Sequence, residues 1–242
     1  MRTNKPDAAN PAIASRFHSG HQWRGVADPE RSARSTAGKF ALGVVILGAG
    51  ASSRMGQCKL LLPWGNTSVI GHLIRQWRAL AVDQTAVVLA AGDAKLHSEL
   101  DRLGFPRRDR IENPAPERGM FSSIRCAGTW NGWKADLTYW AIVLGDQPHL
   151  KLGTLRALLK FHRDHPDAIC QPGFAGRARH PVLLPRRAFT ELRHSRAGTL
   201  REFLHRTTVP AAVCPVDDPG LALDLDRPED YQEALRLFAK TA

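Results

Sequence analysis

The fold is constrained most by an alternation of short apolar runs with longer amphipathic segments, which begins at residue 40 and continues to the C-terminus. The first run (Phe-Ala-Leu-Gly-Val-Val-Ile-Leu) is almost continuously apolar, as is typical of a strand buried on both faces of a parallel sheet. We expect strands at residues 40–47, 85–90, 110–112, 140–144, 168–171, 181–184 and 211–216, and helices at residues 69–81, 94–103, 121–130, 152–165, 187–193, 199–206 and 228–238. This alternation predicts an α/β fold with a single doubly wound, mainly parallel sheet.

Residues 1–38 differ in composition from the rest of the chain. They mix Pro, Ala, Ser, Arg and His with no helical or strand period, so they cannot bury enough apolar area to offset the entropy of ordering. We therefore expect a disordered N-terminal extension at residues 1–38, or a start site assigned too far upstream. One folded domain is expected to follow at residues 39–242.

The chain is strongly basic, with 34 Lys and Arg against 23 Asp and Glu and a formal charge of +11. Clustered cations can neutralise the phosphates of nucleic acids. Here the arginines are scattered, and their concentrations at residues 102–110, 177–187 and 193–206 do not interleave with aromatic residues as a single-strand binding surface does. We expect a solvated basic surface and no nucleic-acid partner, with attraction of an anionic small substrate as a further role for the charge.

The sequence indicates neither a membrane protein nor a secreted one. The longest apolar stretches, residues 40–47 and 139–144, have strand length and fall short of the roughly 20 residues that cross a bilayer. No apolar segment of a signal peptide follows the N-terminal charges. The four cysteines are widely separated and form no CxxC pair, which indicates reduced thiols rather than a zinc site or a disulfide framework. We expect a cytoplasmic protein.

A glycine-rich segment, residues 47–59 (Leu-Gly-Ala-Gly-Ala-Ser-Ser-Arg-Met-Gly-Gln-Cys-Lys), follows the first strand directly. Its glycines permit backbone conformations in which successive amide groups point at an anion. Arg54 and Lys59 add mobile positive charge to the same segment. This combination fits the binding of a triphosphate.

Two common phosphate-binding loops do not match this segment. The dinucleotide fingerprint GxGxxG fails because Ser53 takes the place of the third glycine and the next acidic residue is as far away as Asp83. The P-loop fails because its Gly-Lys-Ser/Thr ending is absent. Open α/β sheets bind ligands at the carboxyl ends of their strands, so we expect the loops after Leu47 and Leu144 to meet at the site.

The same segment resembles the signature of the molybdenum-cofactor nucleotidyltransferases, which is LAAG or LAGG followed by x-S-x-R-M-G-x-x-K. The matching residues are Leu47-Gly-Ala-Gly50, Ser52, Arg54-Met-Gly56 and Lys59, followed by Leu60-Leu-Leu-Pro63, which is common in the cytidylyltransferase branch. The departure is Gly48, where the family usually has Ala. The resemblance extends over residues 40–238 and implies a Rossmann-like nucleotidyltransferase fold of the GT-A type for the domain at residues 39–242.

Further motifs of this family follow in the family's order. They are Asn113, Gly119-Met120 with Ser122-Ser123-Ile124-Arg125, Val143-Leu-Gly-Asp146-Gln147-Pro148, His180-Pro181-Val182-Leu183 and Leu223-Asp224-Leu-Asp226-Arg-Pro228-Glu229-Asp230-Tyr231. Two positions depart from the family's pattern, because Phe121 replaces a smaller residue and Arg179 replaces a glycine. Several independent motifs at this spacing make chance agreement implausible.

The resemblance implies roles for the matched residues. The implied nucleotide-binding residues are Leu47, Gly48, Ala49, Gly50, Ser52, Arg54, Lys59, Asn113, Ser122 and Ser123. The implied catalytic residues are Arg54, Lys59 and Asp146, the implied Mg²⁺ ligands are Asp146 and Asp224 with Asp226 as the alternative second ligand, and the implied acceptor-binding residue is His180. Structural interpretations stay open beside these: a turn residue (Asp146), carboxylates at a helix N-terminus (Asp224, Asp226), N-caps (Ser122, Ser123), solvated cations (Arg54, Lys59) and a structural imidazole (His180).

The resemblance also implies a reaction, the transfer of CMP from CTP to the phosphate of molybdenum-bound molybdopterin with release of pyrophosphate. The preference for CTP rests on Ala49, where guanylyl members tend to have Gly. The alternatives are GMP transfer, another small-phosphate or sugar-phosphate nucleotidyltransferase, and a non-catalytic molybdenum-cofactor chaperone. Retention of Lys59, Asp146 and Asp224 argues against the chaperone. The implied partners are the triphosphate, a molybdopterin-type acceptor and a recipient molybdoenzyme or its chaperone.

Overall fold

The computed structural model describes residues 40–50 and 55–239 of the 242-residue chain, so the N-terminal segment at residues 1–38 lies outside the described residues. The strands are β1 (Leu42–Leu47), β2 (Pro63–Trp64), β3 (Thr67–Ser68), β4 (Gln84–Ala90), β5 (Arg110–Asn113), β6 (Tyr139–Leu144), β7 (Ile169–Phe174), β8 (Arg177–Ala178), β9 (Val182–Pro185) and β10 (Ala211–Pro215). The α-helices are α1 (Val69–Arg78), α2 (Ala94–Arg102), α3 (Met120–Thr129), α4 (Leu152–Phe161), α5 (Arg186–Glu191), α6 (Leu200–Arg206) and α7 (Pro228–Ala239).

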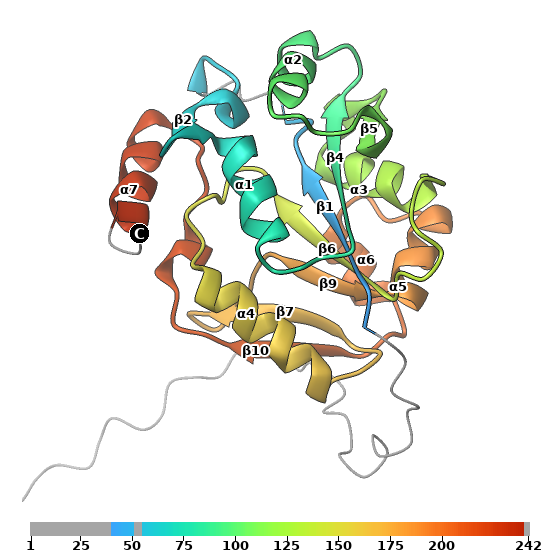
Figure 1. Ribbon diagram of the computed structural model, residues 1–242. Helices are drawn as coiled ribbons and strands as arrows, with labels where there is room; N and C mark the ends of the chain where they lie inside the picture. The colour runs from blue at the N-terminus through green and yellow to red at the C-terminus, as the bar shows by residue number, and fades with distance from the viewer. Residues whose placement is uncertain (1–39, 51–54, 240–242) are drawn as a thin grey trace, which may run out of the picture.

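One large sheet runs through the domain in the strand order β10-β7-β9-β6-β1-β4-β5, with β8 paired to β7 (Figure 1). β1, β4, β5 and β6 are parallel to one another, and β10 is parallel to β7. β9 is antiparallel to both of its neighbours, β6 and β7. The expected α/β fold with a single, mainly parallel sheet is thus confirmed.

Helices cover both faces of this sheet (Figure 1), and each face has its own apolar core. The first core takes residues from α1, α2, α4 and α7, and the second from α3, α5 and α6. Along β1, Val44 and Ile46 belong to the first core and Val45 to the second. Burial on both sides explains why this strand is an almost unbroken apolar run.

β1 and β6 end side by side, and this fixes the loops that follow them. Leu47 pairs with Leu144 in the parallel register, and the Gly145 amide donates a hydrogen bond to the Leu47 carbonyl at 3.1 Å. A Cβ atom at position 145 would lie 2.5 Å from that carbonyl oxygen, so the approach requires glycine. The strand order reverses around β1, which is where open α/β sheets bind their ligands.

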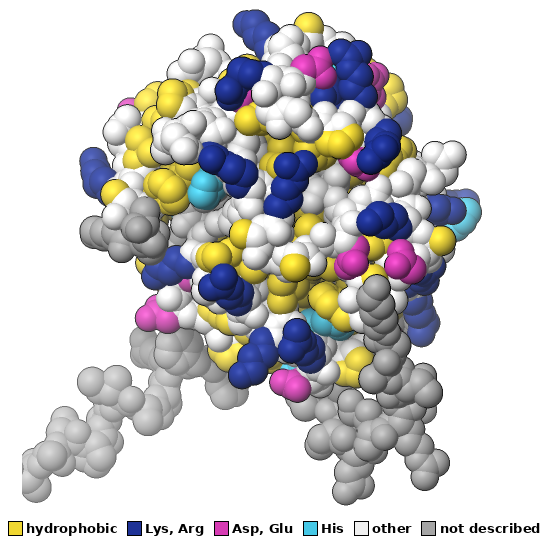
Figure 2. Space-filling view, in the orientation of Figure 1, with side chains coloured by type: hydrophobic (Ala, Val, Ile, Leu, Met, Phe, Trp, Pro, Cys, Tyr) yellow, Lys and Arg dark blue, Asp and Glu magenta, His cyan; other side chains and the backbone are white. Residues whose placement is uncertain are grey.

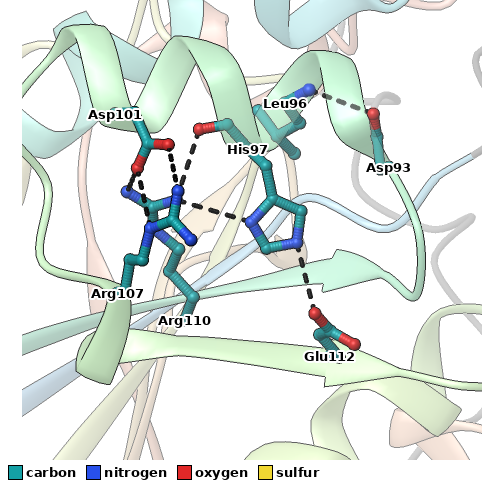
Figure 3. Close-up of polar contacts among 7 residues, drawn as sticks. All are labelled: Asp93, Leu96, His97, Asp101, Arg107, Arg110 and Glu112. Atoms are coloured by element: carbon teal, nitrogen blue, oxygen red, sulfur yellow. Dashed lines mark hydrogen bonds and ion pairs between the residues drawn. The ribbon is translucent and has the colours of Figure 1, made fainter.

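The outer strand β5 is tied to α2 by a polar network (Figure 3). The Arg110 side chain, only 3% exposed, donates to Asp101 Oδ1 at 2.7 Å, and His97 Nε2 lies 3.2 Å from Glu112 Oε1. The sequence predicted a solvated basic surface here, yet Arg110 is buried and paired. The network involves Arg110 and Glu112 of β5, and the same strand ends at Asn113, which is described with the site below.

The structure contains three features that the sequence pattern did not predict. They are the two-residue hairpin strands β2 and β3, the short strand β8, and the antiparallel direction of β9. The helix expected at residues 152–165 ends as an α-helix at Phe161 and continues as a 3-10 turn, His162–Asp164. These differences leave the loops after β1 and β6 where the sequence placed them.

The described part of the chain bears on the expectations for membrane spanning, for the thiols and for the basic surface. Within residues 40–50 and 55–239, no helix has the length and apolar character needed to cross a bilayer. All four cysteines are free thiols. Lys and Arg side chains are spread over the face seen in Figure 2 rather than gathered into one patch.

Candidate functional site

A pocket of about 310 Å³ opens at the carboxyl ends of β1 and β6. Seven of its lining residues were expected to have a role: Leu47, Gly48, Ala49, Gly50, Lys59, Ser123 and Asp146. Pro116, Gly119 and Met120, from the start of α3 and the turn before it, also line the pocket. A neighbouring hollow of about 580 Å³ shares Ala49, Gly50 and Pro116 with it, so the two form one cleft that extends to the loop after β4.

The glycine-rich segment is described on both sides of a gap. Ser52 and Arg54, which the sequence assigned to nucleotide binding, lie outside the described residues. Residues 48–50 leave β1 directly into the pocket, and the 3-10 helix Lys59–Leu61 brings the segment back to it. Backbone amides and the Lys59 ammonium therefore approach one cavity from two sides.

Lys59 is paired with acidic residues at the pocket. Its Nζ donates to Asp146 Oδ2 at 2.6 Å and lies 3.5 Å from Asp226 Oδ1. The Lys59 and Asp146 side chains are only 15% and 21% exposed. The solvated interpretation of Lys59 is therefore wrong, because the ammonium is largely buried between carboxylates from the ends of β6 and of the segment before α7.

Asp224 lies close to this pair. Burial raises the pKa of Asp224, and the negative charge of Asp146 raises it further, while a hydrogen bond from Gln147 opposes the shift. That bond joins Gln147 Nε2 to Asp224 Oδ1 at 2.8 Å. Two carboxylates, Asp146 and Asp226, thus lie within 3.5 Å of one ammonium group, and their charges also act on Asp224. The mutual repulsion of the three carboxylates makes the site attractive to further positive charge.

Asp224 and Asp226 lie just before the start of α7, as the helix-terminus interpretation expected, but neither makes the capping contact. The carboxylate that caps α7 belongs to Asp230, whose Oδ2 accepts hydrogen bonds from the amides of Arg227 at 2.8 Å and Asp226 at 3.2 Å. The side chains of Asp224 and Asp226 point instead to Gln147 and Lys59. The capping role belonged to a residue that the sequence analysis quoted but did not assign.

Asn113, Ser122 and Ser123 form a hydrogen-bonded cluster between β5 and α3. Asn113 Nδ2 donates to Ser122 Oγ at 2.7 Å and to Ser123 Oγ at 3.0 Å. The serines lie inside α3, whose N-cap is Gly119, so the alternative interpretation as N-caps does not hold. Ser123 lines the pocket. Asn113 is 1% exposed and holds the two serine hydroxyls from a buried position outside the pocket lining.

His180 lies beyond the pocket wall, at the end of the sheet beside β6. Its Nδ1 is 3.4 Å from the Ile142 carbonyl. Burial lowers the pKa of His180, while that carbonyl and the charge of Asp146 act in the opposite direction. The imidazole is therefore near Asp146 on the side away from the glycine-rich segment. The adjacent Arg179 has a buried Nε with no hydrogen-bond partner among the described residues.

The carboxylates beside Asp146 are compatible with the expected Mg²⁺ ion. Within the described ranges, no group of three or more His, Cys, Asp or Glu residues is arranged to hold a metal. Mg²⁺ usually takes only one or two carboxylates together with water and phosphate oxygens, so a larger protein cage is not required. Asp146 Oδ1 is buried and has no hydrogen-bond partner among the described residues. An unsatisfied carboxylate oxygen beside Asp224 fits such an ion.

Gln147 belongs to the site, although the sequence analysis assigned it no role. It is 4% exposed and makes the contact with Asp224 described above. The signals in the sequence were its place directly after Asp146 at the end of an apolar strand and its membership of the motif at residues 143–148.

Comparison with known proteins identifies a nucleotidyltransferase family. Residues 44–219 match the family model described as the MobA-like NTP transferase domain. The chain is 33% identical over 155 residues to a molybdenum cofactor guanylyltransferase from Mesorhizobium japonicum, a match that covers 62% of this chain and 70% of that protein. It is 22% identical over 203 residues to the molybdenum cofactor cytidylyltransferase of Escherichia coli K12, covering 83% and 98%.

Solved structures share the fold. A crystal structure of Rv0371c from Mycobacterium tuberculosis H37Rv has a TM-score of 0.64 and 26% identity and covers 81% of this chain and 98% of that one. Another structure of that protein, a complex with manganese, has a TM-score of 0.59 and 24% identity and covers 81% and 99%. The family model spans well over half of the sequence, and the residues that line the pocket fall within the matched range. The chain belongs to the family of MobA-like NTP transferases.

Proposed function

We propose that this protein transfers a nucleoside monophosphate, CMP from CTP, to the phosphate of molybdenum-bound molybdopterin and releases pyrophosphate. An oxygen of the acceptor phosphate attacks the α-phosphorus of the triphosphate, and the bond to the leaving pyrophosphate breaks. The observation that carries this proposal is the meeting of Lys59, Asp146 and Asp226 within 3.5 Å at the end of the glycine-rich segment. A cation and carboxylates beside a glycine-rich segment are groups that a triphosphate and its metal need.

The glycine-rich segment is proposed to hold the triphosphate. Residues 48–50 line the pocket, and Lys59 brings a positive charge to its wall. The Gly48 amide donates to the Val88 carbonyl at 2.7 Å, so the amides of Ala49 and Gly50 are the ones proposed to contact the phosphates. In the free protein this ammonium is paired with Asp146, so a bound triphosphate competes with the carboxylate for Lys59. Arg54 and Ser52 are proposed to complete the phosphate contacts from the part of the segment outside the described residues. Most of the rate then comes from positioning and charge stabilisation.

Asp146 and Asp224 are proposed to hold Mg²⁺, with Asp226 as the alternative second ligand. The buried Oδ1 of Asp146 has no hydrogen-bond partner among the described residues, which leaves this oxygen for a ligand. The pKa of Asp224 is raised by burial and by the charge of Asp146, which indicates that the two carboxylates lie near each other. When bound, the ion neutralises the charge that develops on the phosphate oxygens. The protein's own part is to hold the two carboxylates together at the end of β6.

The acceptor is proposed to enter from the side of His180, opposite the glycine-rich segment. Support comes from the place of His180 near Asp146 and from the unpartnered Nε of the neighbouring Arg179. Asn113 and its two serines lie on the nucleoside side, where Ser123 reaches the pocket and Asn113 fixes its hydroxyl. The two substrates would thus meet at Asp146 from opposite directions.

The choice of CTP rests on Ala49, which lines the pocket and matches the cytidylyl form of the motif. GMP transfer is the second candidate, because the relative from Mesorhizobium japonicum, at 33% identity, is a guanylyltransferase. The relative from Escherichia coli, which is 22% identical and covers 83% of this chain, is a cytidylyltransferase. Both reactions use the same groups around Asp146 and differ only in the base.

A pyrophosphate-release assay tests the proposal. The full chain is incubated with Mg²⁺ and with CTP, GTP, ATP or UTP, in the presence and absence of molybdenum-bound molybdopterin. We expect release that depends on the acceptor and is fastest with CTP. Fastest release with GTP would replace CMP by GMP transfer. No acceptor-dependent release with any triphosphate would contradict nucleotidyl transfer to this acceptor and favour a cofactor-binding role.

A further inference from the structure

Gln147 is the first residue after Asp146, and its amide faces the acidic residues of the site. Its Nε2 donates to Asp224 Oδ1 at 2.8 Å and lies 3.5 Å from the Leu223 carbonyl oxygen. Both partners can only accept hydrogen bonds, so this nitrogen must be the donating end of the amide. The orientation of the Gln147 side chain is therefore set by its contacts.

This orientation leaves the other end of the amide without a donor. Gln147 Oε1 is buried and has no hydrogen-bond partner among the described residues, and the same holds for Oδ1 of the adjacent Asp146. Buried acceptors are almost always satisfied in folded proteins, because leaving them unpaired is costly. Two such oxygens on consecutive residues beside Asp224 are suited to a ligand that supplies positive charge or donated hydrogen bonds.

A hydrated divalent cation has both properties. Its charge suits the Asp146 carboxylate, and its bound waters are strong donors for a neutral amide oxygen. We propose that Gln147 is a positioning residue of the metal site: its Nε2 holds Asp224 beside Asp146, and its Oε1 accepts a hydrogen bond from water bound to the metal. This inference rests on the proposed function, because it requires a metal at Asp146.

The competing explanation is that Gln147 only ties the loop after β6 to the segment before α7. In that case its loss lowers the stability of the protein and leaves the affinity for the metal unchanged. A positioning role predicts instead that loss of Gln147 lowers the affinity for the metal. Loss of such a hydrogen-bonded support typically weakens metal binding by about 10- to 100-fold.

The chain offers a matched control at the other end of the sheet. Gln84 Nε2 also donates to one carboxylate oxygen, Asp109 Oδ1 at 3.1 Å, and to one backbone carbonyl, Gly132 O at 2.9 Å. It lies at the start of β4, whereas the metal site lies at the strands' carboxyl ends. Its Oε1 also accepts a hydrogen bond from the Lys134 amide at 2.8 Å. Gln84→Leu therefore removes contacts of the same kind, and one more, without touching the site.

The test measures binding of Mn²⁺ to the full chain by electron paramagnetic resonance, with a non-hydrolysable CTP analogue present. Gln147→Leu removes both contacts, and Gln147→Asn keeps the amide but shortens its reach. We expect the Mn²⁺ dissociation constant to rise about tenfold or more in Gln147→Leu and less in Gln147→Asn. Gln84→Leu should keep the wild-type constant. Binding of the CTP analogue without metal should be the same in all four proteins.

The outcomes separate this inference from the proposed function. Wild-type Mn²⁺ affinity in both Gln147 variants, or an equal loss in Gln84→Leu, would overturn the positioning role and leave nucleotidyl transfer intact. Should Gln147→Leu fail to fold, Gln147→Asn decides the question alone. A wild-type protein that binds no Mn²⁺, with or without the analogue, would overturn the metal site and the role of Gln147 together.

Discussion

The ion pair between Lys59 and Asp146 joins the two motifs that carry most of the proposed chemistry. Their 2.6 Å contact links the end of the glycine-rich segment to the end of β6, although the residues are 87 positions apart in the sequence. The pair is mostly buried, so its charges are screened less than those of a surface pair. Lys59 thus neutralises carboxylates in the free protein, and in the proposed reaction it also contacts the triphosphate.

Replacing Lys59 by Met should weaken nucleotide binding and also cost stability. The variant leaves Asp146 unpaired near two other carboxylates, which should lower the free energy of unfolding by about 1–2 kcal/mol. Affinity for CTP without metal should fall about tenfold, equivalent to roughly 1.4 kcal/mol. Added Mg²⁺ should restore part of the lost stability, because it replaces the missing positive charge. Isothermal titration and thermal unfolding measure the two effects.

Two controls accompany this prediction. Lys59→Arg keeps the charge and should retain most of the stability. Lys134→Met removes an exposed lysine at the far end of the sheet, where its Nζ donates to the Asp83 carbonyl, and should leave the affinity for CTP unchanged. Wild-type CTP affinity in Lys59→Met would contradict the phosphate-binding role.

At the residue scale, the sequence predicted the charged groups of the site better than their partners. Lys59 and Asp146 were identifiable because each lies in a specific motif next to an apolar strand or a glycine-rich run. The cap formed by Asp230 and the contact of Gln147 with Asp224 depend on which side chains face each other after folding. A sequence gives the type of such a residue and its neighbours in the chain, but not its orientation.

At the scale of elements, the order and type of the main strands and helices were predictable because β1 and β6 are apolar runs and the helices between strands are amphipathic. The direction of β9 was not, since a short apolar run such as Val182–Pro185 has the same composition in a parallel or an antiparallel strand. The β2–β3 hairpin has only two residues in each strand, too few to form a period.

The same hairpin and α1 support the C-terminal helix α7, and with it the acidic segment before that helix. The Phe238 ring lies 5.2 Å from Trp64 and 5.1 Å from His72, measured between ring centroids. Burial lowers the pKa of His72 to about 4, the charge of Arg75 acts in the same direction, and a hydrogen bond to the Pro148 carbonyl opposes it. His72 is thus a neutral residue under α7 at physiological pH.

The packing of α7 should therefore weaken in acid. Unfolded, His72 titrates near pH 6.5, so between pH 6.5 and about 4 the unfolded state binds more protons than the folded state. Stability is lost as the pH falls through this interval. Burial also lowers the pKa of His162 to about 4, so His72→Leu should reduce, but not abolish, the drop in Tm between pH 7 and pH 5. Thermal unfolding at a series of pH values measures this.

The exposed residue His194 supplies the control for that prediction. His194→Leu should show the same dependence of Tm on pH as the wild type. If His72→Leu also showed the wild-type dependence, the neutral imidazole under α7 would have no part in the acid sensitivity of the fold.

For the whole molecule, the match to the family begins at residue 44, and the apolar pattern of the sequence begins at residue 40. We predict that removing residues 1–38 leaves Tm and turnover nearly unchanged, because that segment lacks the apolar period of a packed element. Removing residues 1–47 should abolish folding, since it deletes the central strand β1. Insoluble protein or a large loss of turnover after the shorter truncation would contradict the prediction.

The central claim is that the carboxylate of Asp146 serves catalysis rather than the fold. Asp146→Asn keeps the shape of the side chain and an oxygen that can accept from Lys59, but removes the charge that attracts Mg²⁺. Asp136→Asn, at an exposed carboxylate outside the site, is the control.

The most direct measurement is kcat for pyrophosphate release over a series of Mg²⁺ concentrations, with Tm measured on the same samples. For Asp146→Asn we expect Tm to stay within a few degrees of the wild type and kcat to fall about a hundredfold or more, roughly 3 kcal/mol of transition-state stabilisation. Asp136→Asn should match the wild type in both quantities. A folded Asp146→Asn protein with near-native kcat at low Mg²⁺ would contradict the catalytic role of Asp146.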